Sequence, residues 1–381
     1  MSKTVYFGMC SFNDNVRSYS LASNTLMEYV TDVLHNTCDN FLVVSYAPKK
    51  TDVKQKAEEV TLENGKRVLY LPQALNNDKS KIKRFFTRLK NESALKKGLL
   101  NVLNDGDTLV VYHSLGIMKH ISEIRRKRKI KLILEVCEIY SDVRGDKKER
   151  EKELDFIKSA DGYIFSSSTL NRLLNKENKP FAICMGAYKN APIYDKVPSE
   201  DKKCHIVYAG TFNLIKGGVV NAIEAAKYLD EGYHLHLLGL AEGELFKVVV
   251  KKMLETLAET GCEITYDGCL QGEEYLKFLQ KCDIGLSTQT GTSAFNETSF
   301  PSKILVYLAN GLKVVSCNIS PVKSSELSND LFFYEGTDPE SIARAIQEAN
   351  KAEKTDTRAT VSKLDKEFCE QILDLLRKTN D

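Results

Sequence analysis

Residues 296–311 read NETSFPSKILVYLANG, and the strand-like segment LKVVSC follows directly at 312–317. Polar residues and a proline lead into an apolar helix, which the pair Asn310-Gly311 ends. A helix start presents unpaired N–H groups and a partial positive charge, so it is a natural site for an anion. The stretch therefore indicates either a joint of the fold or a phosphate-binding site.

Short apolar segments alternate with longer helical ones on both sides of this stretch. In the second half the expected strands are HIVYAG, YHLHLLG, CEITYDG, DIGLSTQ, KVVSCN and DLFFYE. In the first half they are TVYFGMC, NFLVVSYA, RVLYLP, DTLVVYHS, KLILEVCE and GYIFSSS. Strands without a clean polar alternation, separated by helices, are typical of buried parallel sheets.

This pattern predicts an α/β protein with two tandem, doubly wound, Rossmann-like domains. Residues 190–203 hold two prolines and many charges, which is typical of a linker. We expect an N-terminal domain at 1–195, a second domain at 196–358, and a C-terminal helix at 359–381 that packs back on the first domain. Ligands of such sheets bind beyond the carboxyl ends of the strands, so we expect the two domains to face each other across one cleft.

The composition agrees with a soluble globular protein. The chain has 381 residues, of which 42% are hydrophobic and 28% are charged. We expect no signal peptide, and no apolar run approaches the roughly 20 residues of a membrane-spanning helix. Ten scattered cysteines without a Cys-x-x-Cys pair argue against a zinc motif or a disulfide framework and favour a reducing cytoplasm.

The net charge of +2 conceals an asymmetry between the two halves. Residues 1–190 hold 33 Lys and Arg against 23 Asp and Glu, whereas the remainder holds 21 against 29. Much of the basic excess lies at 79–98 and 124–131. Two interpretations stay open: a solvated helix face with a turn, or a surface for an anionic lipid or a phosphate-bearing acceptor. Nucleic acid is disfavoured because no aromatic platform accompanies the charges.

A second candidate for anion binding is residues 206–218, IVYAGTFNLIKGG. The strand ends at Gly210, and a loop leads through Lys216 and Gly217 into the next helix. Glycines allow close backbone approach, while Lys216 and the helix start offer positive charge to a phosphate. The segment is neither a Walker loop nor the Gly-x-Gly-x-x-Gly fingerprint, so a plain strand–helix turn is the alternative.

Three further segments carry polar residues near strand ends. HLHLLGLAEGEL (234–245) is another strand–glycine–helix unit, in which His234 and His236 are interpreted as packing residues rather than metal ligands. KCDIGLSTQT (281–290) ends in hydroxyl and amide side chains suited to a ribose or a sugar. Asp105-Gly-Asp107 precedes a strand and is interpreted as a turn, so no metal site is predicted.

Taken together, the second-half segments resemble the C-terminal half of GT-B glycosyltransferases of the "glycosyl transferases group 1" type, which are retaining and family 4-like. The matching text is YAGTFNLIKGG, HLHLLGLAEG, YDGCLQGEEYLKFLQKCDIGLSTQ and FPSKILVYLANGLKVVS. The resemblance covers about residues 204–350. In the first half VVYHSLG, LEVCEIYSDVRG and ADGYIFSSSTLNRLL match more loosely. The resemblance implies a nucleotide-sugar donor, no other cofactor and no obligatory metal.

The resemblance also implies site residues. Lys216 matches the lysine that neutralises the donor diphosphate, and family members carry two glutamates near the last helix. The second glutamate falls at 306, where this chain has Val306; the first falls at 298, where it has Thr298, so Glu297 is the candidate. The arginine that often precedes the lysine is missing. The residues implied on the donor side are Gly210, Thr211, Lys216, Gly217, Gly239, Ser287, Ser299, Phe300, Pro301, Ser302, Lys303 and Val306.

Polar residues at strand tips of the first half are candidates for the acceptor side. The catalytic candidates are Lys216, Glu297 and Glu138, and the acceptor-side candidates are Arg17, His113, Tyr140 and Ser141. For His113 and Glu138 a structural role is an equal alternative to a contact with a sugar hydroxyl. For the loop of Arg17 the alternative is an ordinary helix cap.

The sequence thus predicts a cytoplasmic, retaining glycosyltransferase that acts on a saccharide acceptor, which could be lipid-linked, at the inner face of the membrane. Synthesis of surface polysaccharide or glycoconjugates fits this interpretation. Two alternatives stay open: a non-catalytic partner subunit or carbohydrate-binding protein, and a sugar-nucleotide epimerase on the same fold. A nicotinamide dehydrogenase is disfavoured because no glycine fingerprint follows a strand.

Overall fold

The computed structural model describes residues 2–12, 16–50, 56–194, 201–210, 212, 217–240, 243–289, 294–353 and 355–381. The chain divides into two compact units. Unit 1 comprises Met1–Ala187 and Glu367–Asp381, and unit 2 comprises Tyr188–Lys366. The division therefore falls eight residues before the boundary expected from the linker composition.

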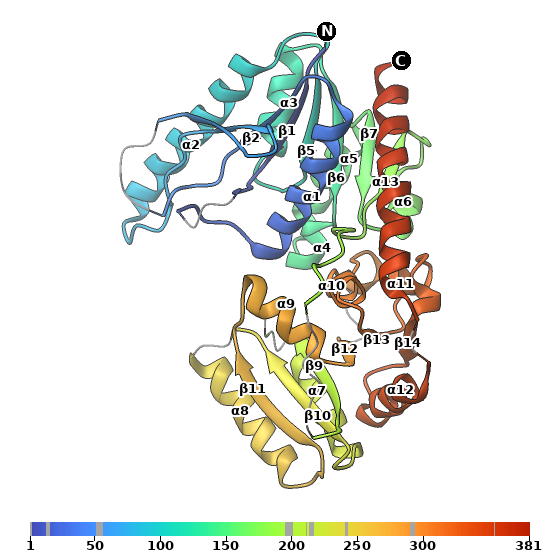
Figure 1. Ribbon diagram of the computed structural model, residues 1–381. Coiled ribbons are helices and arrows are strands. Elements are labelled where there is room, and N and C mark those ends of the chain that lie inside the picture. The colour runs from blue at the N-terminus through green and yellow to red at the C-terminus, as the bar shows by residue number, and fades with distance from the viewer. Residues whose placement is uncertain are drawn as a thin grey trace. The chain divides into compact units, whose positions relative to one another are not determined.

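Unit 1 is built on an eight-stranded sheet in the order β3-β4-β2-β1-β5-β6-β7-β8 (Figure 1). All neighbours are parallel except β3 and β4, which are antiparallel. The strands are β1 (Thr4–Gly8), β2 (Phe41–Ser45), β3 (Glu58–Thr61), β4 (Arg67–Tyr70), β5 (Thr108–Tyr112), β6 (Lys131–Val136), β7 (Gly162–Phe165) and β8 (Phe181–Ile183). Strands β1, β2, β5 and β7 are buried throughout, as their continuous apolar runs predict.

The helices of unit 1 follow its strands in sequence. They are α1 (Leu21–Thr37), α2 (Lys81–Val102), α3 (Met118–Lys127), α4 (Tyr140–Arg144), α5 (Lys147–Lys158) and α6 (Ser168–Leu174). The last part of α13 (Thr357–Asn380) also belongs to unit 1 and lies beside β7 (Figure 1). There the Gln371 side chain accepts a hydrogen bond from the backbone N–H of Ile183 (2.7 Å). The end of the C-terminal helix is thus part of the first unit, whereas its first residues, up to Lys366, belong to the second.

A buried carboxyl group lies in the core of unit 1. Tyr6 on β1 donates a hydrogen bond to Glu135 Oε2 on β6 (2.5 Å), and both side chains are buried. Burial raises the pKa of Glu135 to about 7, and the hydrogen bond from Tyr6 lowers it only in part. Glu135 is therefore a titrating group of the fold near neutral pH.

We expect Glu135→Gln to change how stability depends on pH. Between pH 4.5 and 7 native Glu135 holds a proton that the unfolded chain has lost, so this group stabilises the fold less as pH rises. The amide does not titrate. The free energy of unfolding of the variant, relative to that of wild type, should therefore be about 2 kcal/mol higher at pH 8 than at pH 5. Urea unfolding at both pH values measures this. If the unfolding free energies of variant and wild type differ by the same amount at both pH values, the prediction is wrong.

Unit 2 has a six-stranded, wholly parallel sheet in the order β11-β10-β9-β12-β13-β14. Its strands are β9 (Cys204–Ala209), β10 (Tyr233–Leu238), β11 (Glu263–Gly268), β12 (Ile284–Ser287), β13 (Lys313–Cys317) and β14 (Leu331–Tyr334). Its helical segments are α7 (Gly218–Ala225), η1 (Ala226–Tyr228), α8 (Gly243–Leu257), α9 (Gly272–Lys281), η2 (Ala294–Glu297), α10 (Lys303–Ala309), α11 (Ser320–Lys323), η3 (Ser328–Asp330) and α12 (Pro339–Lys351).

The expected strands all appear, and two more are present that the sequence did not predict. Strand β3 (EEVT) is charged and largely exposed at the edge of the sheet, so it has no apolar signal. Strand β8 (FAI) has only three residues. The α/β architecture with two parallel sheets is confirmed.

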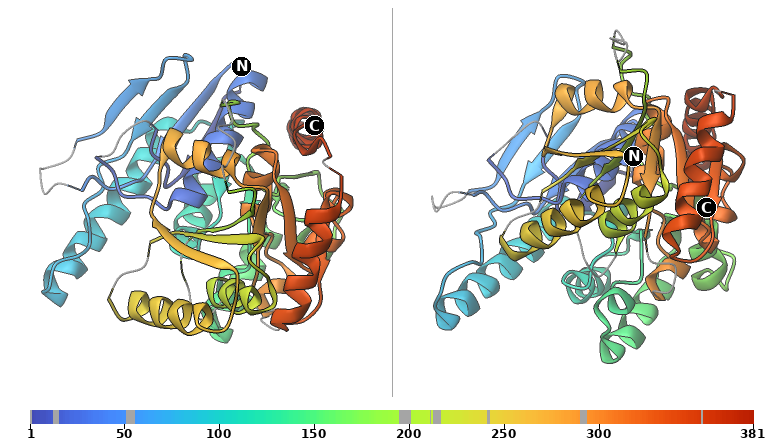
Figure 2. Two further views of the ribbon diagram at one scale, coloured as in Figure 1. Left: turned by 60° about the horizontal axis from the view of Figure 1, so that its bottom comes forward. Right: turned by 90° about the horizontal axis from the view of Figure 1, so that it is seen from below.

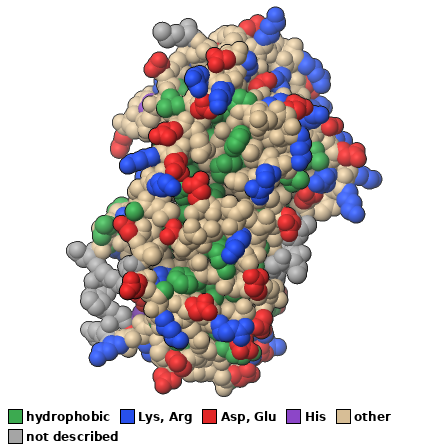
Figure 3. Space-filling model, turned by 90° about the vertical axis from the view of Figure 1, so that its right-hand side faces the viewer, with side chains coloured by type: hydrophobic (Ala, Val, Ile, Leu, Met, Phe, Trp, Pro, Cys, Tyr) green, Lys and Arg blue, Asp and Glu red, His purple; other side chains and the backbone are tan. Residues whose placement is uncertain are grey.

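The surface does not separate into areas of one charge on the face drawn in Figure 3, where acidic and basic side chains are intermixed. Within the described ranges no helix has both the length and the apolar character needed to cross a membrane. The ten cysteines are free thiols.

Candidate active site

The sheet of unit 2 opens at one point, between β9 and β12. These neighbours are not consecutive in the chain: β10 and β11 extend the sheet on one side of β9, and β13 and β14 on the other side of β12. Their pairing covers only Ile206–Ile284 and Val207–Gly285 and stops before either strand ends. Such a switch point leaves a crevice at the carboxyl ends of the strands, where ligands of open α/β sheets bind.

Tyr307 of α10 lies where β9 and β12 separate. Its side chain is fully buried, and its hydroxyl accepts a hydrogen bond from the backbone N–H of Ala209 (2.9 Å) and lies 3.3 Å from the carbonyl oxygen of Leu286. One phenol thus holds both strands where they separate. A Cβ at Gly285 would lie 2.3 Å from the Tyr307 ring, so only glycine lets the ring reach this position.

We expect Tyr307→Phe to destabilise the protein by about 1–3 kcal/mol, because the buried N–H of Ala209 loses its acceptor. Thermal or urea unfolding measures the loss. Tyr228→Phe is the matched control: Tyr228 is 48% exposed, and the change should cost less than about 0.5 kcal/mol. Equal effects of the two substitutions would contradict the bridging function of Tyr307.

Backbone segments approach each other closely around the crevice. A Cβ at Gly239 would lie 2.1 Å from the carbonyl oxygen of Gly210, and one at Gly218 would lie 2.4 Å from that of Thr288. Thr288 also donates a hydrogen bond from its hydroxyl to the Gly218 carbonyl (2.6 Å). Gly217 caps α7 with a φ of +67°, a value that favours glycine. These glycines bring the starts of two loops and a helix to the ends of β9, β10 and β12.

Lys303 places a positive charge at this edge. Its ammonium lies 4.0 Å from the centre of the Tyr208 ring and 3.4 Å from where a Cβ of Gly210 would be. The first residue of α10 thereby reaches the carboxyl end of β9, more than ninety positions earlier in the chain. Because α10 has only seven residues, the side chain of Lys303 supplies more of the positive charge here than the helix dipole does.

Two expected donor-side residues, Thr211 and Lys216, fall outside the described residues. Ser287 is buried at the end of β12, and Gly210, Gly217, Gly239 and Lys303 lie around the crevice. Ser299, Phe300, Pro301 and Ser302 precede α10, and Phe300 is buried. Val306 is half-buried on α10, and Glu297 is exposed at the end of η2. Thr288 belongs to the same site and lies in the segment 281–290, which was predicted for the hydroxyl and amide side chains at its strand end. Tyr307 also belongs to the site, and the sequence did not single it out.

No protein-family model matches the chain, and no curated protein sequence matches it. Solved structures do. The apo structure of OtsA superposes with a TM-score of 0.68 at 10% identity over 99% of this chain and 97% of that chain. Sucrose-phosphate synthase from Thermosynechococcus elongatus has a TM-score of 0.68 at 15% identity, over 98% of each chain. An α,α-trehalose-phosphate synthase from Burkholderia xenovorans in complex with glucose-6-phosphate has a TM-score of 0.64 at 12% identity, over 99% of this chain and 98% of that chain.

The fold is GT-B. At these identities the likeness establishes the fold alone, and it confirms the fold that the sequence resemblance implied. The crevice of unit 2 is the switch point of the second GT-B domain, and its chemistry is judged from its own residues.

In the first GT-B domain the expected acceptor-side residue His113 is fully buried. Its Nε2 lies 2.8 Å from Glu153 Oε1, and Glu153 is also fully buried. Glu153 accepts hydrogen bonds from the backbone N–H groups of Tyr140 and Ser141, both 2.8 Å. Burial raises the pKa of Glu153, but the hydrogen bonds from His113 and Ser141 outweigh it and the net pKa is lowered. His113 therefore positions Glu153, and Glu153 in turn binds the backbone at the start of α4. The sequence did not single out Glu153.

Arg17 likewise has structural partners. It is 2% exposed, its guanidinium lies over the Tyr70 ring (3.7 Å), and it donates hydrogen bonds to Glu58 Oε2 (2.9 Å) and the Ala47 carbonyl (3.3 Å). These contacts join the loop after β1 to the strands beside it. Glu138 follows β6 and is half-buried, and the Tyr140 hydroxyl donates to that of Tyr112 (3.3 Å).

Proposed function

We propose that this protein is a retaining glycosyltransferase whose nucleotide-sugar donor binds at the switch point of unit 2. The observation that carries the proposal is the position of Lys303, whose ammonium lies at the glycine-lined end of β9. Departure of a nucleoside diphosphate leaves negative charge, and preorganised positive groups lower the barrier to that step. Lys216 is proposed as the second positive group, and no metal or other cofactor is proposed for the reaction.

Structures with the same fold support the choice of donor class. One such structure, described as trehalose-6-phosphate from E. coli, is bound with UDP-2-fluoro glucose. In this chain Val306 stands where the resemblance places a glutamate for the ribose. We therefore propose that diphosphate contacts contribute more to donor affinity here than ribose contacts do, and Glu297 is the candidate for contact with the donor sugar.

The test is to incubate the pure protein with a panel of nucleotide sugars and to measure both nucleotide binding and release of nucleoside diphosphate. We expect one nucleotide sugar to bind, and its diphosphate to be released faster when an acceptor is present. Lys216→Ala should abolish binding. Conversion of the donor without diphosphate release would instead identify an epimerase. If no nucleotide binds, the proposal is refuted and the non-catalytic partner subunit becomes the better interpretation.

The exposed residues of helix α2 support the hypothesis that the acceptor lies at an anionic membrane surface. Its residues Ile82, Phe85, Phe86 and Leu89 follow the i, i+3, i+4, i+7 spacing of one helix face and are between 43% and 70% exposed. Lysines and arginines flank them: Lys81, Lys83, Arg84, Arg88 and Lys90. The N-terminal half of α2 projects from the rest of unit 1 in both views of Figure 2. Apolar side chains beside basic ones are typical of helices that bind anionic lipid.

We therefore propose a lipid-linked saccharide acceptor, with the protein acting at the inner face of a membrane in glycoconjugate or surface-polysaccharide synthesis. Sedimentation with vesicles tests this. The protein should bind vesicles containing phosphatidylglycerol and not purely zwitterionic ones, and Phe85→Ser with Phe86→Ser should abolish binding. Val248→Ser with Leu254→Ser, two exposed positions on α8, should not. Absence of vesicle binding would refute the lipid-linked acceptor but leave the donor site untouched.

A further inference from the structure

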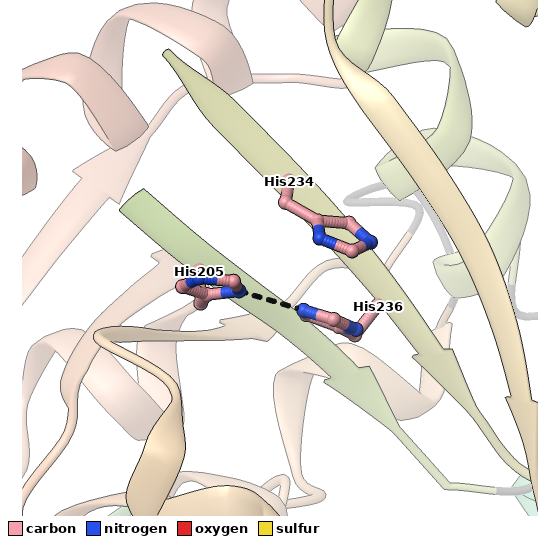
Figure 4. Close-up of side chains that lie close together, drawn as sticks. All are labelled: His205, His234 and His236. Atoms are coloured by element: carbon pink, nitrogen blue, oxygen red, sulfur yellow. Dashed lines mark hydrogen bonds between the residues drawn. The ribbon is translucent and has the colours of Figure 1, made fainter. Parts of the chain in front are cut away.

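Three of the chain's six histidines meet on one face of the sheet of unit 2 (Figure 4). His205 lies on β9, and His234 and His236 lie on β10, where the parallel register pairs His234 with His205. Alternate residues of a strand point to the same face, so the three rings converge. One ring nitrogen from each residue lies within 4.8 Å of the others.

Each of the three rings is oriented by an oxygen atom. His205 Nε2 lies 3.1 Å from Asp201 Oδ1, His236 Nδ1 lies 3.2 Å from Asp267 Oδ2, and His234 Nε2 lies 3.0 Å from the Thr265 hydroxyl. Thr265 in turn donates to Asp267 Oδ2 (2.9 Å). Carboxylates that bind the outer nitrogen of a histidine fix the ring and its tautomer, as they do around metal ions.

The inner nitrogens of two rings face each other. His205 Nδ1 lies 2.9 Å from His236 Nε2 (Figure 4), and the rings of His234 and His236 are only 3.8 Å apart between centroids. Two nitrogens bound to one tetrahedral zinc ion at about 2.05 Å would be roughly 3.3 Å apart, so a small rotation of the rings would admit an ion.

The face of the sheet that carries the histidines is unusually polar. A face of a parallel sheet is normally apolar, yet here Glu263, Thr265 and Asp267 alternate on β11 beside the histidines of β10. The histidine side chains are 10–13% exposed, so water reaches them. Imidazole nitrogens surrounded by carboxylates suit a divalent cation.

We propose that His205, His234 and His236 form a binding site for a divalent transition-metal ion of the Zn²⁺ type. Each residue contributes one ring nitrogen, and Asp201 and Asp267 orient two of the rings. The ion would join β9 to β10 near their amino ends. The switch-point site lies at the opposite ends of the same strands, so the metal stabilises unit 2 and is not part of the transfer reaction.

The experiment titrates the full-length protein, stripped with EDTA, with Zn²⁺ against a chromogenic chelator, and with Co²⁺ followed by visible absorption. We expect one equivalent to bind, a d–d spectrum of nitrogen-ligated Co²⁺, and a melting temperature that rises with Zn²⁺ concentration. His236→Gln should weaken Zn²⁺ binding by at least about tenfold, and Asp267→Asn, which keeps all three ligands, by about 10–100-fold. Circular dichroism of each variant verifies folding.

Two controls separate this site from others. His35→Gln removes a histidine of unit 1, and Cys269→Ser removes the exposed thiol near the end of β11; neither should change Zn²⁺ affinity. Loss of binding in Cys269→Ser, or unchanged affinity in His236→Gln, would overturn the proposal. So would a wild-type protein that binds no Zn²⁺ below millimolar concentrations.

Discussion

Replacing Lys303 with methionine is expected to lower kcat/KM for the nucleotide-sugar donor by about 100-fold or more. The ammonium lies at the end of β9, over the Tyr208 ring and beside Gly210. Methionine keeps a chain of similar length but removes the charge that would face the leaving diphosphate. Loss of one preorganised group of this kind typically costs 10²–10³ in rate. Steady-state kinetics with the donor identified by the panel measure the effect.

The matched control is Lys323→Met. Lys323 also places its ammonium over an aromatic ring, that of Phe333 at 4.5 Å, and it belongs to the same unit, on α11. It therefore has the same cation–π chemistry but does not lie at the switch point. We expect the control to keep wild-type activity and both variants to keep wild-type folding. Activity of Lys303→Met within threefold of wild type would refute a donor diphosphate at this site.

The second large effect is expected at Glu153. Glu153→Ala removes the acceptor for the backbone N–H groups of Tyr140 and Ser141 and the partner of His113. All of these groups are buried or half-buried, so we expect a loss of about 3–5 kcal/mol in the free energy of unfolding. The chain contains no tryptophan, so unfolding in urea is best followed by far-UV circular dichroism.

Glu149→Ala on the same helix α5 provides the comparison. Glu149 pairs with Lys152 (2.8 Å) on the surface, and exposed ion pairs contribute less than about 1 kcal/mol. A conservative change, Glu153→Gln, keeps one acceptor oxygen and should be intermediate. Equal stability of Glu153→Ala and Glu149→Ala would show that the network around His113 does not stabilise unit 1.

Twelve of the fourteen described strands could be predicted because each of the twelve carries a local signal. The strands of unit 2 lie in segments that end at a glycine or a polar residue, although β11 (EITYDG) is itself half polar. The segment around Lys303 was predicted as a helix start beside a phosphate site. The charged edge strand β3 escaped prediction because its residues do not alternate with apolar ones. Glu153 escaped because it lies within KKEREKELDFIK, which resembles a solvated helix. Its spacing from the buried Phe156 and Ile157 was the available signal.

The sequence by itself determined the order of strands and helices, the two-unit α/β architecture, and the glycines and lysine of the second half. Those features depend on local periodicity and on conformations that a few neighbouring residues prefer. The tertiary structure alone decided that Tyr307 reaches Ala209, 98 positions away, that Lys303 lies over Tyr208, and that His205 joins His234 and His236. Contacts between adjacent strands depend on sheet order and register, and these are set by the packing of the whole domain rather than by the residues in contact.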